Sequence, residues 1–429
     1  MPMNTSIKRT LLATIAIGAI IAAPFSAHAA KIHAKPHAAA SAAKGTEGAD
    51  PEKATATPMP TGPVPVPDSP TADKNTPAPP TLPDMTSYVL MDATTGAILA
   101  EAAPNLQVAP ASLTKLMTAH ITYQALHHGS LKLDQTVPVS PAAWHAGGSR
   151  MFIDTTSVVT VDQLLHGLII DSGNDAAVAL AEQIAGSQSA FVQMMTKDAA
   201  DMGLTNTVYT NATGLPDPAM HTTAMDVAKL SRIILRDEPE FLDISKQQSY
   251  NFNNITQASW NPVLAHDSTV DGMKTGLTDE SGHCIDATAV RGGRRLIAVV
   301  MGGPTWHDST AAIESILNYG EKFFTDVTLA SPGTQIDTLQ SSALDAGQVA
   351  VGVAQASVIT LPADAAGHVQ HSVAYTTDVS NGVTKGEVLG TINYTLDGKT
   401  IATLPAVALA DAPAASWSTK LSRAIKKML

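Results

Sequence analysis

The stretch that decides the fold is "GHCIDATAVRGGRRLIAVVMGG", Gly282–Gly303, in which two apolar runs flank Gly292–Gly293. Apolar runs on either side of adjacent glycines predict a β-hairpin. A second hairpin is predicted far upstream, in "SYVLMDATTGAILAEA", Ser87–Ala102, around Asp92–Gly96. Because the strand signals lie at the two ends of this region and helical patterns lie between them, we expect one antiparallel sheet that pairs sequence-distant strands and is covered by helices.

Apolar residues recur at helical spacing between the two hairpins and after the second one. The first of these helices is predicted to begin at Ser112 and to stop at Gly129. The sequence "DSGN" then breaks a long apolar region into two helices. All the further helices predicted by this spacing cover residues 160–170, 175–186, 190–204 and 308–324.

The pattern changes after about residue 330. Residues 331–412 carry strand and turn signals with almost no helical period, which predicts a small all-β domain. The fold class is therefore α+β, with a first domain over 85–330 and a small all-β domain after it. No catalytic cluster is evident in the second domain.

The last residues, 413–429, form a third region. In "SWSTKLSRAIKKML" the apolar residues fall on one helical face, and four basic residues give a charge of +4 in a chain whose net charge is −12. A basic amphipathic helix of this kind is typical of an in-plane anchor on anionic lipid, here through residues 416–429. The alternatives are a helix docked on its own domain and a disordered tail.

The N-terminal residues read as an export signal and a spacer. Residues 1–30 combine Lys8 and Arg9, a short apolar core and a small-residue cleavage site, which predicts a signal peptide and export from the cytoplasm. An uncleaved anchor is the alternative. Residues 31–84 hold 12 of the 27 prolines and no aromatic residue, so they are expected to form an extended, disordered linker.

Composition excludes several classes of function. The acidic net charge of −12 argues against nucleic-acid binding, which needs a clustered basic surface. Cys284 is the only cysteine, so no intrachain disulfide forms, and a lone cysteine is most often a small buried apolar residue. The histidines show no metal-ligand spacing, and no phosphate-binding glycine loop follows a strand. We therefore predict no metal and no cofactor.

Ser112 and Lys115 lie three residues apart in "PASLTKLMTAH", Pro110–His120, and so share one face of the predicted helix. A serine hydroxyl becomes a nucleophile at neutral pH when a base lies within hydrogen-bond reach. Lysine serves as that base when burial or a nearby cation lowers its pKa. Taken alone this pair is a weak signal, because a serine helix cap followed by a solvated lysine is common.

Two further fragments strengthen the catalytic interpretation. Ser172 and Asn174 stand in the break between two apolar helices, where buried polar side chains need partners. Lys274, Thr275 and Gly276 precede the Gly282–Gly303 hairpin. The lysine and threonine offer a cation and a hydroxyl to a carboxylate, and the glycine lets a substrate backbone approach an edge strand.

Together, Ser-x-x-Lys, Ser-x-Asn and Lys-Thr-Gly in this order resemble the signature of the penicillin-recognising serine acyltransferases. Within them the sequence is most similar to the D-alanyl-D-alanine carboxypeptidases, the low-molecular-mass penicillin-binding proteins. The resemblance runs from about Ser87 to the C-terminus, in wording such as "LIIDSGNDAAVALAE" and "VDGMKTGLTDESG". It implies a β-lactamase/transpeptidase-like catalytic domain over 85–330, the small all-β domain, and a membrane-anchoring tail on the periplasmic face of the cytoplasmic membrane.

The resemblance also implies a reaction. Ser112 attacks the peptide bond between two D-alanines of a peptidoglycan stem peptide and forms an acyl-enzyme, Lys115 takes its proton, and water hydrolyses the ester. Ser172 relays a proton to the leaving D-alanine, and Asn174 holds Lys115 and the substrate amide. A β-lactam antibiotic, which mimics the D-Ala-D-Ala end, is expected to trap Ser112.

The remaining implied roles concern substrate binding. Lys274 and Thr275 receive the terminal carboxylate beside Gly276, and the backbone N–H groups of Ser112 and Leu277 form the oxyanion hole. Two positions depart from the family. Leu277 stands where relatives often carry histidine, and Trp260 stands where some offer a basic residue.

Three other functions remain open from the sequence. A serine β-lactamase shares the three fragments, but "DEPEFLDIS" lies too far beyond Asn174 to supply its deacylating glutamate, so we expect a helix end followed by a surface turn there. A D,D-endopeptidase uses the same site. A non-catalytic wall-binding scaffold with a degenerate site is disfavoured because every residue of the three fragments is intact.

Overall fold

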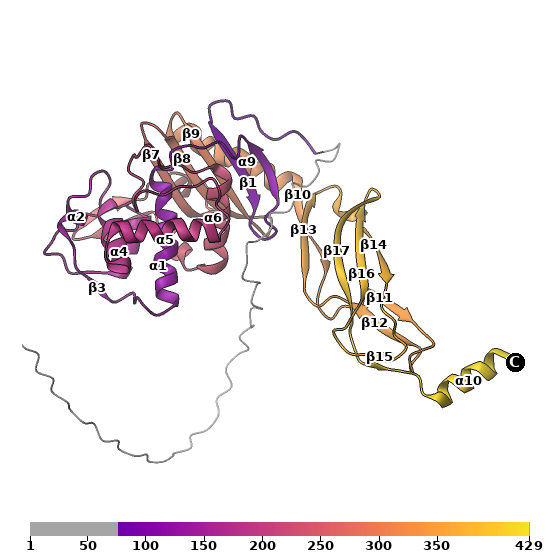
Figure 1. Ribbon diagram of the computed structural model, residues 1–429. Helices are drawn as coiled ribbons and strands as arrows, with labels where there is room; N and C mark the ends of the chain where they lie inside the picture. Colours follow the sequence, from indigo (N-terminus) through magenta and orange to yellow (C-terminus); the bar gives the residue numbers. More distant parts are fainter. Residues whose placement is uncertain (1–75, 429) are drawn as a thin grey trace, which may run out of the picture. The chain divides into compact units, whose positions relative to one another are not determined.

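The computed structural model describes residues 76–428 of the chain (Figure 1). The expected signal peptide, 1–30, and most of the expected linker, 31–84, lie outside this range. The last linker residues are held against the first domain, because the hydroxyls of Tyr88 and Tyr319 donate to the backbone oxygens of Pro80 (2.9 Å) and Pro77 (2.8 Å).

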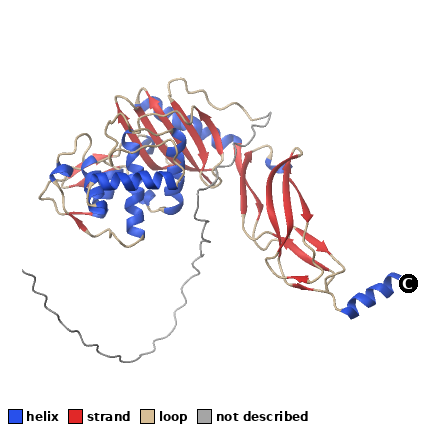
Figure 2. Cartoon of the chain, in the orientation of Figure 1, coloured by secondary structure: helices blue, strands red, loops and turns tan. Residues whose placement is uncertain are grey.

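The first domain is built on a five-stranded antiparallel sheet with the strand order β2-β1-β9-β8-β7. Figure 2 draws its strands as red arrows among the blue helices of this domain. Its strands are β1 (Ser87–Asp92), β2 (Ile98–Ala102), β7 (Val270–Thr278), β8 (Gly282–Arg291) and β9 (Arg294–Gly303). The two predicted hairpins join where β1 pairs with β9, with Leu90 opposite Ala298. This confirms the expected pairing of strands from the two ends of the region.

Helices cover both faces of this sheet (Figure 1). The longer ones are α1 (Lys115–His127), α3 (Val161–Ile169), α4 (Asn174–Ala185), α5 (Gln188–Asp201), α6 (Ala224–Asp237) and α9 (Trp306–Phe323). Shorter elements are η1 (Ala111–Thr114), α2 (Pro141–Trp144), α7 (Phe241–Ser245), α8 (Val263–His266), the pair β3 (Thr136–Val137) and β4 (Val159–Thr160), and the pair β5 (Ser249–Phe252) and β6 (Ile255–Ala258).

Successive side chains along each strand point to opposite faces of the sheet, so the interior is divided into two cores. Leu90 and Leu296 pack with Ile313 and Ile316 of α9 on one face of the sheet. On the opposite face, sheet residues join the larger core formed with α1, α3, α4 and α6. Cys284 is fully buried in that larger core, as expected for a small apolar residue.

Helix boundaries follow local capping chemistry. The predicted helix at Ser112 opens as the 3₁₀ turn η1 before α1 begins. Helix α4 ends at Gly186, which adopts a φ of 75° that favours glycine. Helix α9 begins two residues earlier than the predicted start at Asp308, because the Thr305 side chain accepts the backbone N–H of Asp308 and caps it.

Helix α6 ends at Asp237 and a turn at Pro239–Glu240, with Pro239 exposed, follows it as expected. The residue between them has a partner that the sequence did not indicate. Glu238 is buried and accepts a hydrogen bond at 2.9 Å from Nδ1 of His120 on α1. The carboxylate and the imidazole pair their hydrogen-bonding groups with each other inside the core. The local sequence of a helix end does not reveal such a long-range partner.

The C-terminal strands form a separate all-β core. Five of them make a sheet with the order β11-β12-β17-β16-β14 around Val351, Leu389 and Ile392. The strands are β10 (Phe324–Ala330), β11 (Asp337–Gln340), β12 (Gln348–Gly352), β13 (Ser357–Pro362), β14 (Gln370–Tyr375), β15 (Gly382–Val383), β16 (Val388–Leu396), β17 (Lys399–Ala408) and β18 (Ala412–Pro413), with the short turn η2 (Ala366–His368).

The chain ends in the predicted helix, α10 (Trp417–Met428). Trp417, Leu421 and Ile425 recur on it at intervals of four residues and are exposed. Within residues 76–428, no helix is both long enough and apolar enough to cross a membrane.

Candidate active site

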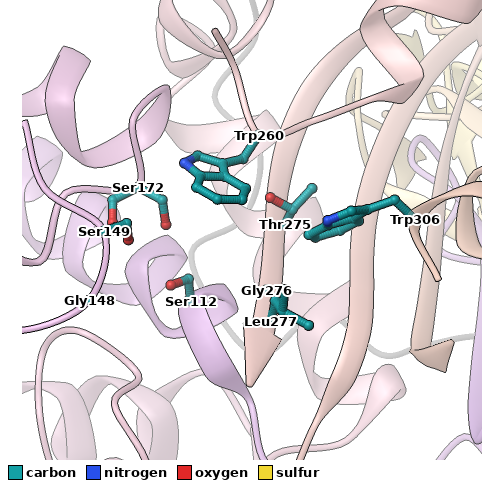
Figure 3. A pocket seen from close by; sticks show the side chains of 9 residues that line it. All are labelled: Ser112, Gly148, Ser149, Ser172, Trp260, Thr275, Gly276, Leu277 and Trp306. Carbon is teal, nitrogen blue, oxygen red and sulfur yellow. Dashed lines mark hydrogen bonds between the residues drawn. The ribbon is translucent and has the colours of Figure 1, made fainter. Parts of the chain in front are cut away.

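The residues singled out from the sequence converge on one cavity in the first domain (Figure 3). The cavity has a volume of about 370 Å³. Ser112 contributes to its floor from η1, Ser172 comes from the turn between α3 and α4, and β7 supplies one wall. All its lining residues are Ser112, Gly148, Ser149, Ser172, Trp260, Thr275, Gly276, Leu277 and Trp306.

Ser112 and Lys115 form the predicted nucleophile–base pair. Lys115 Nζ lies 2.9 Å from Ser112 Oγ and 2.7 Å from the backbone oxygen of Thr213. The Lys115 side chain is 1% exposed. Burial, followed by the repulsion of the Lys274 ammonium, holds the pKa of Lys115 well below its usual range, and Asp175 opposes this shift only in part. A neutral amine is therefore accessible beside the serine hydroxyl.

Ser172 and Lys274 form a second serine–lysine pair across the cavity. Lys274 Nζ donates to Ser172 Oγ at 3.0 Å and to the backbone oxygen of Thr275 at 3.0 Å. Burial lowers the pKa of Lys274 to about 7. The ammonium thus holds a proton that it shares with Ser172, and near neutral pH it gives that proton up readily.

Asn174 differs from its implied role. Its Nδ2 donates to the backbone oxygen of Gly147 at 2.6 Å, and it has no hydrogen bond to Lys115. Its Oδ1 is buried and has no partner among the described residues. Asn174 therefore ties the 147–149 wall to α4 and leaves an acceptor free. The partner of Lys115 is the Thr213 carbonyl instead, a backbone group that no side-chain pattern in the sequence could indicate.

Asp175, which sequence reasoning passed over, fixes the same wall. Its carboxylate accepts the backbone N–H groups of Met151 (3.0 Å), Phe152 (2.9 Å) and Ile153 (3.2 Å). Ser149 Oγ also donates to the backbone oxygen of Ser172 at 2.7 Å. These hydrogen bonds pair backbone N–H groups of the loop that would otherwise be buried without an acceptor. They also hold Gly148 and Ser149 against the cavity.

Gly276 is also needed for a reason that the sequence did not indicate. A Cβ placed there would lie 3.1 Å from Ala111 Cβ and 3.2 Å from the Pro110 backbone oxygen. The absence of a side chain lets the edge strand β7 pack directly against η1 and brings Thr275 beside Ser112. Gly276 also lines the cavity, so the predicted contact with a substrate backbone remains a prediction.

Leu277 and Trp260, the two departures from the family pattern, both face this cavity (Figure 3). The exposed fractions of their side chains are 43% and 44%. Trp306 from α9 lines it as well, and nothing in the local sequence distinguished that residue. Within residues 76–428, no group of three or more histidine, cysteine, aspartate or glutamate side chains is placed to hold a metal ion.

A buried lysine beside each of two serines, on a helix-covered antiparallel sheet, defines a penicillin-recognising serine acyltransferase. The model of the D-alanyl-D-alanine carboxypeptidase family matches residues 73–305, and the model described as "Penicillin-binding protein 5, C-terminal domain" matches residues 324–414. The chain belongs to the D-alanyl-D-alanine carboxypeptidase family and is a serine peptidase.

Relatives with this family name are similar to the chain over most of its length. It is 36% identical to the D-alanyl-D-alanine carboxypeptidase DacC of Escherichia coli over 334 residues, covering 76% of this chain and 84% of the relative. It is 37% identical to DacA of Haemophilus influenzae over 323 residues, covering 74% and 82%. The solved structure of penicillin binding protein 5 from Haemophilus influenzae superposes with a TM-score of 0.71 at 35% identity, covering 78% of this chain and 99% of that one.

Proposed function

We propose that this enzyme removes the terminal D-alanine from peptidoglycan stem peptides that end in D-Ala-D-Ala, through an ester on Ser112. The observation that carries the proposal is the pair of hydrogen bonds Lys115–Ser112 (2.9 Å) and Lys274–Ser172 (3.0 Å) on opposite sides of one cavity. Each serine has its own buried amine, so one pair activates the nucleophile and the other delivers a proton to the leaving group.

The acylation step follows from this arrangement. Neutral Lys115 takes the Ser112 proton as Oγ bonds to the carbonyl carbon of the penultimate D-alanine. The carbonyl oxygen becomes an oxyanion, which the backbone N–H groups of Ser112 and Leu277 stabilise. As the tetrahedral intermediate collapses, the C–N bond breaks and the leaving amine takes a proton from Ser172, which Lys274 replenishes. The terminal carboxylate sits at Thr275, near the Lys274 charge.

Hydrolysis of the ester regenerates the enzyme. Water attacks the acyl carbon and loses its proton to Lys274, which is neutral after acylation, while the acyl C–O bond to Ser112 breaks and Lys115 returns to Ser112 the proton that it took. Asn174 Oδ1, buried and without a partner, is an acceptor for the amide of the bound acyl group. A β-lactam acylates Ser112 in the same way, but its leaving nitrogen stays tethered, so the antibiotic remains on the serine.

The test is the product formed from diacetyl-L-Lys-D-Ala-D-Ala, measured by mass spectrometry. Loss of one alanine is the expected result, and Ser112→Ala abolishes it. Transfer of the acyl group to an amine acceptor would instead make the enzyme a transpeptidase, and cleavage of crosslinked dimers alone would make it an endopeptidase. A preparation that neither hydrolyses the peptide nor reacts with penicillin would identify a scaffold.

We further propose the division of the chain. Residues 85–330 would form the catalytic domain, 331–412 the small all-β domain and 413–429 a membrane anchor. The pairing of β10 with β13 favours moving the first boundary to Phe324, where the second family match also begins. The signal peptide and the linker remain predictions.

We also propose attachment to an anionic membrane surface on the periplasmic face. The apolar residues Trp417, Leu421 and Ile425 are exposed on one helix, and Lys420, Arg423 and Lys426 add positive charge nearby. Co-sedimentation with phosphatidylglycerol vesicles tests this, and Leu421→Asp is expected to release the protein. Binding that is equal for the two proteins would contradict it.

A further inference from the structure

Helix α10 contacts the all-β core through its polar face. Thr419 Oγ1 donates to Asp345 Oδ1 at 2.8 Å. Nη1 of Arg423 donates to two backbone oxygens of the loop 342–345, each at 2.9 Å, and Nη2 donates to a third at 2.7 Å. Within residues 416–426, Thr419 and Arg423 are partly shielded from solvent, and every other residue is exposed. These two side chains therefore form the docking face of the helix.

The apolar face lies on the other side of the same helix. Trp417, Leu421 and Ile425 are 78%, 44% and 50% exposed. Thr419 and Arg423 follow the first two of them by two positions, which is a rotation of about 200° at 3.6 residues per turn. A helix that docks on its own domain to complete a core buries its apolar residues there. Helix α10 does the opposite, so its docking leaves the apolar face free.

The residues before α10 are tied to the same loop. The backbone N–H of Ala415 donates to the backbone oxygen of Ala343 at 2.7 Å, and that of Asp345 donates to the backbone oxygen of Pro413 at 2.8 Å. The helix is thus held at its start and again at Arg423. A helix of 12 residues is marginal in water by itself, so these contacts stabilise it before it meets a membrane.

The basic residues of α10 divide accordingly into two groups. The guanidinium of Arg423 is engaged by three carbonyl oxygens, which its planar fork of donors reaches together. Lys420 and Lys426 are exposed, and their amines have no partner among the described residues. Free amines beside an exposed apolar face fit a bilayer of anionic lipid. They fit a second copy of the chain poorly, because pairing the same face would bring like charges together.

We propose that Arg423 clamps α10 to the loop 342–345 and thereby presents a preformed apolar face to a bilayer of anionic lipid. The proposal rests on the proposed attachment to a membrane, and it gives Arg423 a positioning role in place of a contact with lipid. A free amphipathic segment becomes helical only on binding, and this ordering weakens the binding. The clamped helix avoids most of that loss. Because a helix with its side chains is about 10 Å across, the loop is also held within about 10 Å of the lipid surface.

Limited trypsin digestion without vesicles tests the clamp. Arg423→Lys keeps the charge but replaces the planar fork by a single ammonium, so α10 should open more often and cleavage after Lys420 should be roughly tenfold faster. Lys426→Arg is the matched control, because it also conserves charge but changes a side chain that does not touch the loop. It should be cleaved after Lys420 at the wild-type rate. Equal rates for the wild type and Arg423→Lys would overturn the proposal.

Co-sedimentation with phosphatidylglycerol vesicles tests the role of the clamp in attachment. The amount bound by Leu421→Asp is subtracted as background. Arg423→Lys is expected to bind roughly threefold more weakly or worse, because its binding-competent helix is only fractionally populated, whereas Lys426→Arg binds like the wild type. If charge alone held the helix on lipid, both variants would bind like the wild type, and that result would overturn the proposal.

Other failures give different patterns. If no protein binds vesicles above the Leu421→Asp background, a bilayer does not cover the apolar face, even where Arg423→Lys is cleaved faster. A dimer that forms without vesicles and is dissolved by Leu421→Asp would show that a second copy covers this face. Either result would overturn the proposal. Release of D-alanine without vesicles should be equal in all these variants, so that assay reports on the peptidase function alone.

Discussion

Gly214→Ala is expected to inactivate the enzyme without touching a catalytic side chain. Gly214 adopts a φ of 83°, and a Cβ there would lie 1.8 Å from the Ala111 backbone oxygen and 2.4 Å from its carbonyl carbon. Ala111 precedes the nucleophile, and Thr213, whose carbonyl holds Lys115, precedes Gly214. The substitution therefore presses apart the two segments that align Ser112 with its base.

The size of the effect follows from the distances. Relief of a 1.8 Å contact to an ordinary one widens the distance between the two backbone segments by about 1.6 Å, and misplacement by about 1 Å already costs on the order of 100-fold in rate. The left-handed backbone adds about 1–2 kcal/mol of instability for any residue with a Cβ. We expect a loss of about 100-fold in the rate constant for acylation by fluorescent penicillin.

Gly186→Ala is the matched control. Its φ is 75°, but nothing lies within 4 Å of the added Cβ. It carries the same backbone penalty, so its thermal midpoint falls while acylation stays close to wild type. If Gly214→Ala acylates at the wild-type rate, or if Gly186→Ala loses as much activity, the argument from the Ala111 contact is wrong.

Three further predictions concern the titrating groups. The kcat/KM for peptide hydrolysis should fall above about pH 7 as Lys274 loses its proton, and Lys274→Arg should remove this alkaline fall. An unchanged alkaline limb in that variant would assign the fall to another group. Because burial and the Lys274 charge hold the pKa of Lys115 well below its usual range, Lys115 is the base of the reaction, and its protonation toward acid pH should lower kcat/KM. Ser172→Ala should lower kcat by about 100-fold or more with a smaller change in KM, because proton delivery acts in the transition state, and an equal rise in KM would indicate a binding role instead. Burial raises the pKa of Asp286 to about 7, so the folded protein keeps a proton that the unfolded chain releases above its ordinary pKa, and stability is lost as pH rises from about 4 to 7. Asp286→Asn should remove up to about 4 kcal/mol of that loss, seen as a flatter dependence of the urea midpoint on pH, whereas a parallel curve would contradict the assignment.

Many of the site residues could be predicted from the sequence, because each lies in a short motif whose local structure, a helix start or a hairpin, is also visible in the sequence. Ser112 and Lys115 share a helical face, and the two apolar runs on either side of Gly292–Gly293 predicted the hairpin formed by β8 and β9. Each signal depended on residues close together in the chain, which a periodic pattern encodes directly.

The rest depended on contacts that no local pattern encodes. The Thr213 carbonyl reaches Lys115 across 98 residues, and it acts through backbone, so the side chain at that position carries no signal. Asn174 was assigned to Lys115 from the family pattern, yet its amide bonds to Gly147 because the 147–153 loop folds over α4. Gly276 was assigned to a substrate, and the pattern did not indicate its second role, which is to leave room for Pro110, Ala111 and Leu113 around the nucleophile.

The most direct test of the central claim is the site of covalent attachment. Full-length protein is mixed with a penicillin, quenched in acid, digested and mapped by mass spectrometry. A single adduct on Ser112 is predicted, absent in Ser112→Ala and formed far more slowly in Lys115→Met, where no amine remains to take the proton. An adduct on Ser172, or acylation of Lys115→Met at the wild-type rate, would contradict the assignment of nucleophile and base.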